Sequence, residues 1–222
     1  LLRDSGTQID EVDDNKFVIA PALTLRPATG TEITILANYS DQDSDTAHQF
    51  LPVTGTLLPS ASGEKIDSYE YMGAPGFNAY DTESFALTLI LEQQLSDAFS
   101  FEAVGRYVDS KADYRQAWIA FQGNGVPRID ANGDGAWTFY LADNRSEQLA
   151  LDARVRGEFN TGPIRHELLV GVQTQDVFTD SDTAYVFNAG TLNVFNPQYT
   201  NAPTVEQIRD LQVNGPRNYV DS

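Results

Sequence analysis

Cysteine is absent from the 222 residues of the chain, and histidine occurs only twice, as His48 and His166. The lack of cysteine excludes disulfides, thiolate metal sites and thiol catalysis. Because only two imidazole groups are present, a zinc site or a catalytic relay built on histidine is not expected. The sequence also lacks a Ser/His/Asp arrangement, a loop with paired carboxylates and a phosphate-binding glycine loop. We therefore do not expect an enzyme.

Basic residues are also scarce. The chain has 14 Lys and Arg against 32 Asp and Glu, which gives a net charge of −18. Nucleic acids are polyanions, and proteins that bind them need clustered positive charge. The composition therefore argues against a nucleic-acid partner. The acidic excess fits either a well-solvated surface or a cluster of acidic groups that attracts cations.

Long hydrophobic runs are missing as well. No stretch reaches the roughly 18 apolar residues that a membrane-spanning helix requires. The opening residues, LLRDSGTQID, lack the basic start and apolar centre of a signal peptide, and there is no initiator methionine. The strand pattern described below is cut at both ends, which predicts a piece of a longer protein. A β-barrel could still cross a membrane, because it does so without an apolar helix.

Apolar side chains alternate with other residues in several parts of the chain. In the stretch 17–41, they recur at every second position on both sides of a turn at 27–30. The same period of two recurs around turns at 96–98 and 160–163. A period of two is typical of β-strands, and a short turn between two such runs predicts an antiparallel hairpin. The sequence therefore predicts three hairpins.

The connections between these hairpins are much longer, at about 42–80, 116–136 and 180–222. Short periplasmic turns at one end and long extracellular loops at the other are typical of outer-membrane barrels. We therefore predict an all-β fold, an antiparallel transmembrane β-barrel segment with about seven strands of a larger barrel. Aromatic residues near the strand ends fit interfacial girdles. The charges on the other face are expected to face the interior of the barrel and its lumen water; they are Arg106, Asp152, Arg154, Arg156 and Glu158.

Two neighbouring stretches carry a family resemblance. The strand IAPALTLRP (Ile19–Pro27) and the loop FLPVTGTLLPSASGEKIDSYEYMGAPGFNAYDTESF (Phe50–Phe85) resemble TonB-dependent ferric-siderophore receptors, especially the ferrichrome/hydroxamate type. The matching loop residues are Leu51–Pro59, Gly73, Pro75, Phe77, Tyr80 and Asp81. Leu25 departs from the family pattern, which has an aromatic there, and Thr82 stands where a basic residue is common.

The resemblance implies a barrel of about 22 strands with an N-terminal plug domain and a TonB box. Residues 1–222 would supply a partial barrel domain, with the plug absent. It also implies an outer-membrane receptor that binds ferric siderophore and imports it by plug-gated, energy-coupled transport. Its partners would be TonB, through the missing plug and TonB box, and outer-membrane lipid and lipopolysaccharide. Alternatives are the same receptor type for another cargo, such as cobalamin or an oligosaccharide, and a passive porin.

Aromatic side chains in or near the long segments are the candidate ligand-binding residues. The resemblance implies that loop aromatics line the ligand pocket, where rings stacked on a chelate surface supply affinity. The candidates are Tyr69, Tyr71, Phe77, Tyr80, Trp118 and Trp137, and Phe121 and Tyr140 are further aromatic residues in or near these segments. The alternative for each ring is packing within a loop or at the membrane interface.

The stretch RIDANGDGAW (Arg128–Trp137) begins like a calcium loop. Asp130, Asn132 and Asp134 have the alternating spacing at which oxygen side chains converge on a hard cation. The twelfth position is Leu141 instead of a bidentate glutamate, which excludes a standard EF-hand. An incomplete calcium site and a plain Asx/Gly turn are the two interpretations. With calcium bound, a soluble, secreted, β-rich calcium-binding module is the alternative to a receptor.

Overall fold

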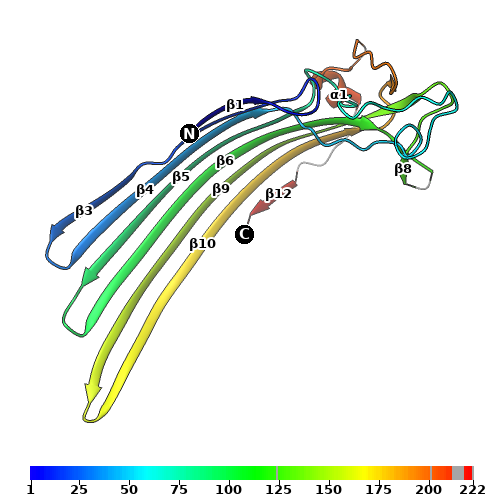
Figure 1. Cartoon of the computed structure of the whole chain (residues 1–222). Helices are drawn as coiled ribbons and strands as arrows, with labels where there is room; N and C mark the ends of the chain where they lie inside the picture. Colours follow the sequence, from blue (N-terminus) through cyan, green and yellow to red (C-terminus); the bar gives the residue numbers. More distant parts are fainter. Residues whose placement is uncertain (124, 201, 212–217, 222) are drawn as a thin grey trace.

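Ten strands of the chain form one antiparallel sheet in the computed structural model, which describes residues 1–123, 125–200, 202–211 and 218–221. The strands run in the order β1-β2-β4-β5-β6-β9-β10-β12; β3 also pairs with β4, and β11 pairs with β9. Figure 1 shows a long curved sheet with three tight turns at one end, the turn end, and larger loops at the other, the loop end.

The strands of this sheet are β1 (Leu2–Gly6), β2 (Asp13–Ile19), β3 (Ala22–Ala28), β4 (Thr31–Ser44), β5 (Ala79–Gln94), β6 (Phe99–Ile119), β9 (Asp134–Thr161), β10 (Ile164–Val186), β11 (Thr191–Asn193) and β12 (Asn218–Asp221). A small second sheet pairs β7 (Phe121–Gln122) with β8 (Val126–Pro127), and α1 spans Val205–Leu211. Within the part of the chain that the structure describes, no helix has the length and apolar character that crossing a bilayer requires.

The three predicted hairpins are confirmed. They join β3 to β4, β5 to β6 and β9 to β10. The first and third turns contain Gly30 and Gly162, with φ values of 78° and 62°. Glycine suits these positions because residues with a Cβ rarely adopt positive φ.

Three strands are longer than the sequence pattern predicted. β6 continues to Ile119, β9 begins at Asp134 and β10 continues to Val186. Parts of the segments predicted as loops at 116–136 and 180–222 are therefore strand. The pairing of β6 with β9 stays in register up to its last pair at the loop end, although charged residues replace apolar ones on one face.

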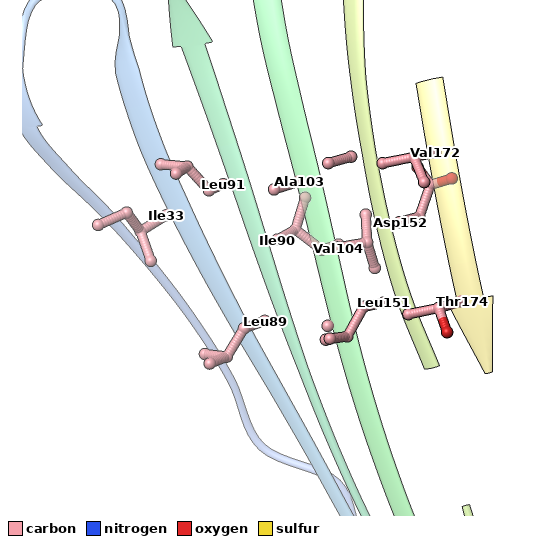
Figure 2. Close-up of a pocket in the computed structure, with 12 residues that line it drawn as sticks. Ile33, Leu89, Ile90, Leu91, Ala103, Val104, Leu151, Asp152, Val172 and Thr174 are labelled. Carbon is pink, nitrogen blue, oxygen red and sulfur yellow. The ribbon is translucent and has the colours of Figure 1, made fainter. Parts of the chain in front are cut away.

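The two faces of the sheet differ at the turn end. Side chains directly opposite each other on neighbouring strands share a face. Leu91, Ala103, Ala153 and Val172 lie in one such row, on what we call the apolar face. Figure 2 shows side chains from this face, such as Leu89, Leu91 and Val172, around a depression of about 570 Å³; Ile90, Val104 and Asp152, which it also labels, belong to the opposite face. Val172 is 71% exposed, so the apolar face presents large hydrophobic side chains to its surroundings.

The opposite face, the polar face, carries charged side chains at the turn end. Glu102 and Arg154 lie opposite each other on β6 and β9 and form an ion pair with an N–O distance of 2.5 Å. Arg106 lies on the same face of β6, because it is four residues from Glu102 and side chains alternate along a strand. This arrangement confirms the alternation of apolar and polar faces predicted for the hairpins.

Candidate functional site

A layer of aromatic rings lies on the polar face at the loop end. Tyr80 of β5 is directly opposite Tyr114 of β6, and their ring centroids are 5.9 Å apart. Tyr114 in turn lies 5.9 Å from the ring of Tyr140 on β9. Tyr114 is eight residues from Arg106, an even number, so it projects from the polar face. The aligned strands therefore assemble a tyrosine row from three separate parts of the sequence.

A second group of rings extends this layer toward the loops. The ring of Trp118 lies 6.1 Å from Tyr185 on β10 and 5.9 Å from Phe50 in the loop between β4 and β5. Phe50 also contacts Phe121, at 5.1 Å. We call the whole set the polar-face aromatics; they are Phe50, Tyr80, Tyr114, Trp118, Phe121, Tyr140 and Tyr185. Four of these rings, those of Phe50, Tyr80, Phe121 and Tyr185, are more than one third exposed.

A cavity of about 770 Å³ opens beside the tyrosine row. It is lined by Tyr80, Tyr114 and the loop segment 45–48. The segment contributes one acidic group, Asp45, whose carboxylate accepts a hydrogen bond from the backbone N–H of Asp13 at 3.0 Å. Burial raises the pKa of Asp45 above its ordinary value. The lining contains no Lys or Arg from the described residues.

The wall below the aromatic layer is uncharged. Between Arg106 and Tyr114, the polar face has three rows of side chains that run across β4, β5, β6, β9 and β10. The structure describes these five strands throughout, and none of the three rows contains a charged side chain. One complete row consists of hydroxyl groups, those of Ser40, Ser84, Ser110, Ser146 and Thr179. Five strands spaced by about 4.8 Å give this row a width of about 19 Å.

In the same part of the sheet, the charged side chains lie on the other face. One row contains Glu83, Lys111 and Arg145, and the next contains four aspartates, Asp81, Asp113, Asp143 and Asp182. Arg115 forms ion pairs with the first two aspartates, and Arg209 of α1 with the other two. Charge is therefore separated by face: it lies on the polar face at the turn end and on the extension of the apolar face at the loop end.

The main hydrophobic core also lies on the extension of the apolar face, where loops pack against the strands. Its strand members include Ile119, Phe139 and Leu141, and its loop members include Met72. α1 contributes Ile208, which is completely buried. This cluster, the loop core, anchors the connections at 45–78, 187–200 and 202–211 to the sheet.

Three predicted ligand-binding residues lie in this part of the molecule. Tyr71, Phe77 and Trp137 are 1–3% exposed. The Tyr71 hydroxyl donates to the carbonyl of Thr46 at 2.9 Å, and the Trp137 indole N–H donates to the carbonyl of Met72 at 3.1 Å. Burial raises the pKa of Tyr71 well above its ordinary value. These three rings hold the loops together in this structure, and contact of any of them with a ligand stays a prediction.

The other three predicted residues are more accessible. Tyr80 and Trp118 belong to the polar-face aromatics, whereas Tyr69 is 52% exposed in the loop before β5. Tyr114 was not among the aromatic residues predicted from the sequence, whereas Tyr140 was. The distance along β6 from Arg106 could have identified Tyr114, because an even separation within one strand keeps the same face.

The predicted calcium ligands form a tight turn. One carboxylate oxygen of Asp130 accepts the backbone N–H groups of Asn132 and Asp134, at 2.8 and 2.9 Å. The hydrogen bonds from Asp134 and then Asn132 lower the pKa of Asp130. Asp134 accepts a hydrogen bond from the side chain of Asn193, at 2.8 Å. Among the described residues, no group of three or more His, Asp or Glu side chains could hold a metal ion. Calcium binding here stays a prediction.

Curated relatives of this chain include two proteins named as a receptor and as a transporter/phage receptor. The ferrioxamine B receptor of Salmonella typhimurium is 25% identical over 203 residues, which cover 91% of this chain and 28% of that protein. The ferrichrome outer membrane transporter/phage receptor of Escherichia coli is 23% identical over 217 residues, covering 90% and 28%. This chain therefore spans little more than a quarter of their length. No family model matches it.

Solved structures show the same fold. The ferripyoverdine receptor of the outer membrane of Pseudomonas aeruginosa superposes with a TM-score of 0.68 at 16% identity, over 99% of this chain and 28% of that one. The siderophore receptor PiuA from Acinetobacter baumannii superposes with a TM-score of 0.62 at 18% identity, over 96% and 31%. The predicted antiparallel β-barrel fold is confirmed, and so is the predicted resemblance to siderophore receptors.

Proposed function

We propose that this chain is a segment of the barrel wall of a TonB-dependent outer-membrane receptor that binds ferric siderophore and imports it. The observation that carries the proposal is the layer of polar-face aromatics above a wide uncharged wall. Its curated relatives are receptors and transporters for iron chelates by name. The plug that gates the barrel and the TonB box lie outside this chain in the proposal.

The two faces of the sheet fit this placement. The apolar face would contact outer-membrane lipid, because its large hydrophobic side chains are exposed at the turn end. The polar face would line the lumen, with Glu102, Arg106 and Arg154 toward the plug or lumen water. The charged rows on the extension of the apolar face would then lie outside the hydrocarbon, beside lipopolysaccharide head groups.

The character of the site favours a chelate without net negative charge. The described lining of the cavity beside Tyr80 and Tyr114 has one acidic group, Asp45, one imidazole, that of His48, and no Lys or Arg. A multiply anionic ferric catecholate would meet no lysine or arginine there, and burying it without such partners would be unfavourable. A neutral or cationic ferric hydroxamate can instead stack on the rings and hydrogen-bond to tyrosine hydroxyls. The proposed mechanism is binding at the mouth followed by plug-gated translocation, with no covalent step.

The test is iron uptake by cells that carry or lack the complete receptor. We expect uptake of radiolabelled ferric hydroxamate to require the receptor gene and a functional TonB protein. Uptake of cobalamin or an oligosaccharide in place of the chelate would support the alternative cargo. Uptake that continues without TonB would support a passive porin and contradict the proposal.

A further inference from the structure

Two residues that lie directly opposite each other on neighbouring strands each carry a buried polar group without a hydrogen-bond partner among the described residues. Trp118 on β6 and Thr138 on β9 are directly opposite in the register. Thr138 is completely buried. Its hydroxyl oxygen and the indole nitrogen of Trp118 are both inaccessible to solvent, and neither has a partner among the described residues. Buried polar groups of this kind are rare, because burial removes the hydrogen bonds to water that they otherwise make.

The second tryptophan of the chain provides a direct contrast. Trp137 belongs to the loop core and is buried. Its indole N–H donates to the carbonyl of Met72 at 3.1 Å. An indole N–H in this fold can therefore be fully satisfied by a backbone carbonyl. The unsatisfied N–H of Trp118 is a feature of its position on the polar face.

Nearby polar groups are already occupied. The side chain of Gln116, two residues before Trp118, donates to the carbonyl of His48 at 2.7 Å and accepts a hydrogen bond from the Tyr114 hydroxyl. It is therefore committed to holding the segment 45–48 and the tyrosine row. The Trp118 indole N–H and the Thr138 hydroxyl therefore remain available to form hydrogen bonds with an atom of a ligand.

The two rings beside Trp118 are partly exposed. Phe50 and Tyr185 flank the Trp118 ring, and they are 43% and 48% exposed. Phe50 lies in a loop, so a shift of that loop would open the pair toward the cavity side of the polar face. A ligand that enters among these rings could then reach both groups.

We infer that the Trp118 indole N–H and the Thr138 hydroxyl form a hydrogen-bonding subsite for a neutral oxygen atom of the bound chelate. Indole is a donor only, and a threonine hydroxyl can donate or accept. The partner that suits both is therefore a carbonyl-type oxygen, such as that of an amide or hydroxamate. The absence of charged side chains from the neighbouring polar-face levels of β6 and β9 fits a neutral group. This inference rests on the proposed function.

The experiment compares variants of the purified complete receptor that remove single polar atoms. Trp118→Phe removes the N–H and keeps an aromatic ring, and Thr138→Val replaces the hydroxyl by a methyl group of similar size. The control, Trp137→Phe, removes an N–H that the protein itself satisfies. For each protein, the Kd for a ferric trihydroxamate and the melting temperature without ligand are measured.

We expect Trp118→Phe and Thr138→Val each to weaken binding by about tenfold, with a melting temperature at or above that of the wild type. Trp137→Phe should lower the melting temperature and leave Kd within about twofold of the wild type. Unchanged Kd in both polar-face variants would overturn the inference, since the pair would then serve no ligand. A wild-type receptor that binds no ferric chelate would instead refute the proposed function, and the subsite with it.

Discussion

Trp118 and Trp137 are offset by one position in the pairing of β6 and β9, so their indole rings point to opposite faces of the sheet. Ile119, not Trp118, is opposite Trp137, and Thr138 is opposite Trp118. A shift of one residue along a strand changes the face. One tryptophan consequently packs in the loop core, and the other lies among the polar-face aromatics. The same relationship separates residues that hold the loops from residues that can meet a ligand.

The loop core should dominate the stability of the loop end. Phe139 is completely buried and contacts Phe77, with ring centroids 5.0 Å apart. Phe139→Ala should lower the free energy of unfolding by about 3–5 kcal/mol. Tyr80→Ala, at a site 43% exposed, is the matched control and should cost much less. Denaturant unfolding of the complete receptor in detergent measures both, and equal losses would contradict the assignment of the core.

The tyrosine row should contribute to ligand affinity. Tyr80→Ala and Tyr114→Ala each remove a ring that can stack on a chelate, and each should weaken binding by about five- to tenfold. Phe85→Ala is the control, because Phe85 lies five residues from Tyr80 on β5, on the opposite face, and is similarly exposed. Titration of the ferric chelate by fluorescence quenching gives the three affinities. A larger effect from the control than from the tyrosines would refute this placement of the site.

Two neighbouring residues of α1 should differ strongly in their effect on loop stability. Ile208 is completely buried in the loop core, so Ile208→Ala should cost about 2–4 kcal/mol. Arg209 pairs with Asp143 and Asp182, but all three side chains are about one third to one half exposed. Arg209→Ala should therefore cost less than about 1 kcal/mol. Limited proteolysis of the segment 187–211 in each variant measures the difference, and equal cleavage rates would argue against anchoring by apolar packing.

The turn at Asp130 should respond to acid. Its backbone hydrogen bonds lower the folded pKa of Asp130, so the stabilisation is complete above the unfolded value of about 3.9. It should be lost as the pH falls through the folded pKa, below about 4. Proteolytic cleavage of the loop with acid-stable pepsin should therefore increase in that range for the wild type, and Asp130→Asn should show a smaller change.

Calcium provides a separate test of the same loop. If hydrogen bonds alone hold Asp130, Asn132 and Asp134 in place, adding calcium should leave the cleavage rate at pH 7 unchanged. Protection by calcium that disappears in Asp130→Asn would show that the loop is a cation site.

The alternation of apolar residues was sufficient to predict the hairpins and the two faces at the turn end. It was not sufficient at the loop end, because Asp109, Lys111 and Asp113 occupy positions that are apolar farther down β6. A strand continues there because its backbone stays paired, which does not require apolar side chains. The position of the loops over one face depends on packing among distant residues, such as Met72 and Trp137. Sequence spacing alone could therefore not separate the buried rings from the accessible ones.

The most direct test of the proposed function is equilibrium binding of ferric chelates to the purified complete receptor. A neutral ferric trihydroxamate and a triply anionic ferric catecholate should be titrated under identical conditions, at two salt concentrations. We expect saturable binding of the hydroxamate, with weaker or no binding of the catecholate and little dependence on salt. Absence of hydroxamate binding at every concentration tested, or a clear preference for the catecholate, would contradict it.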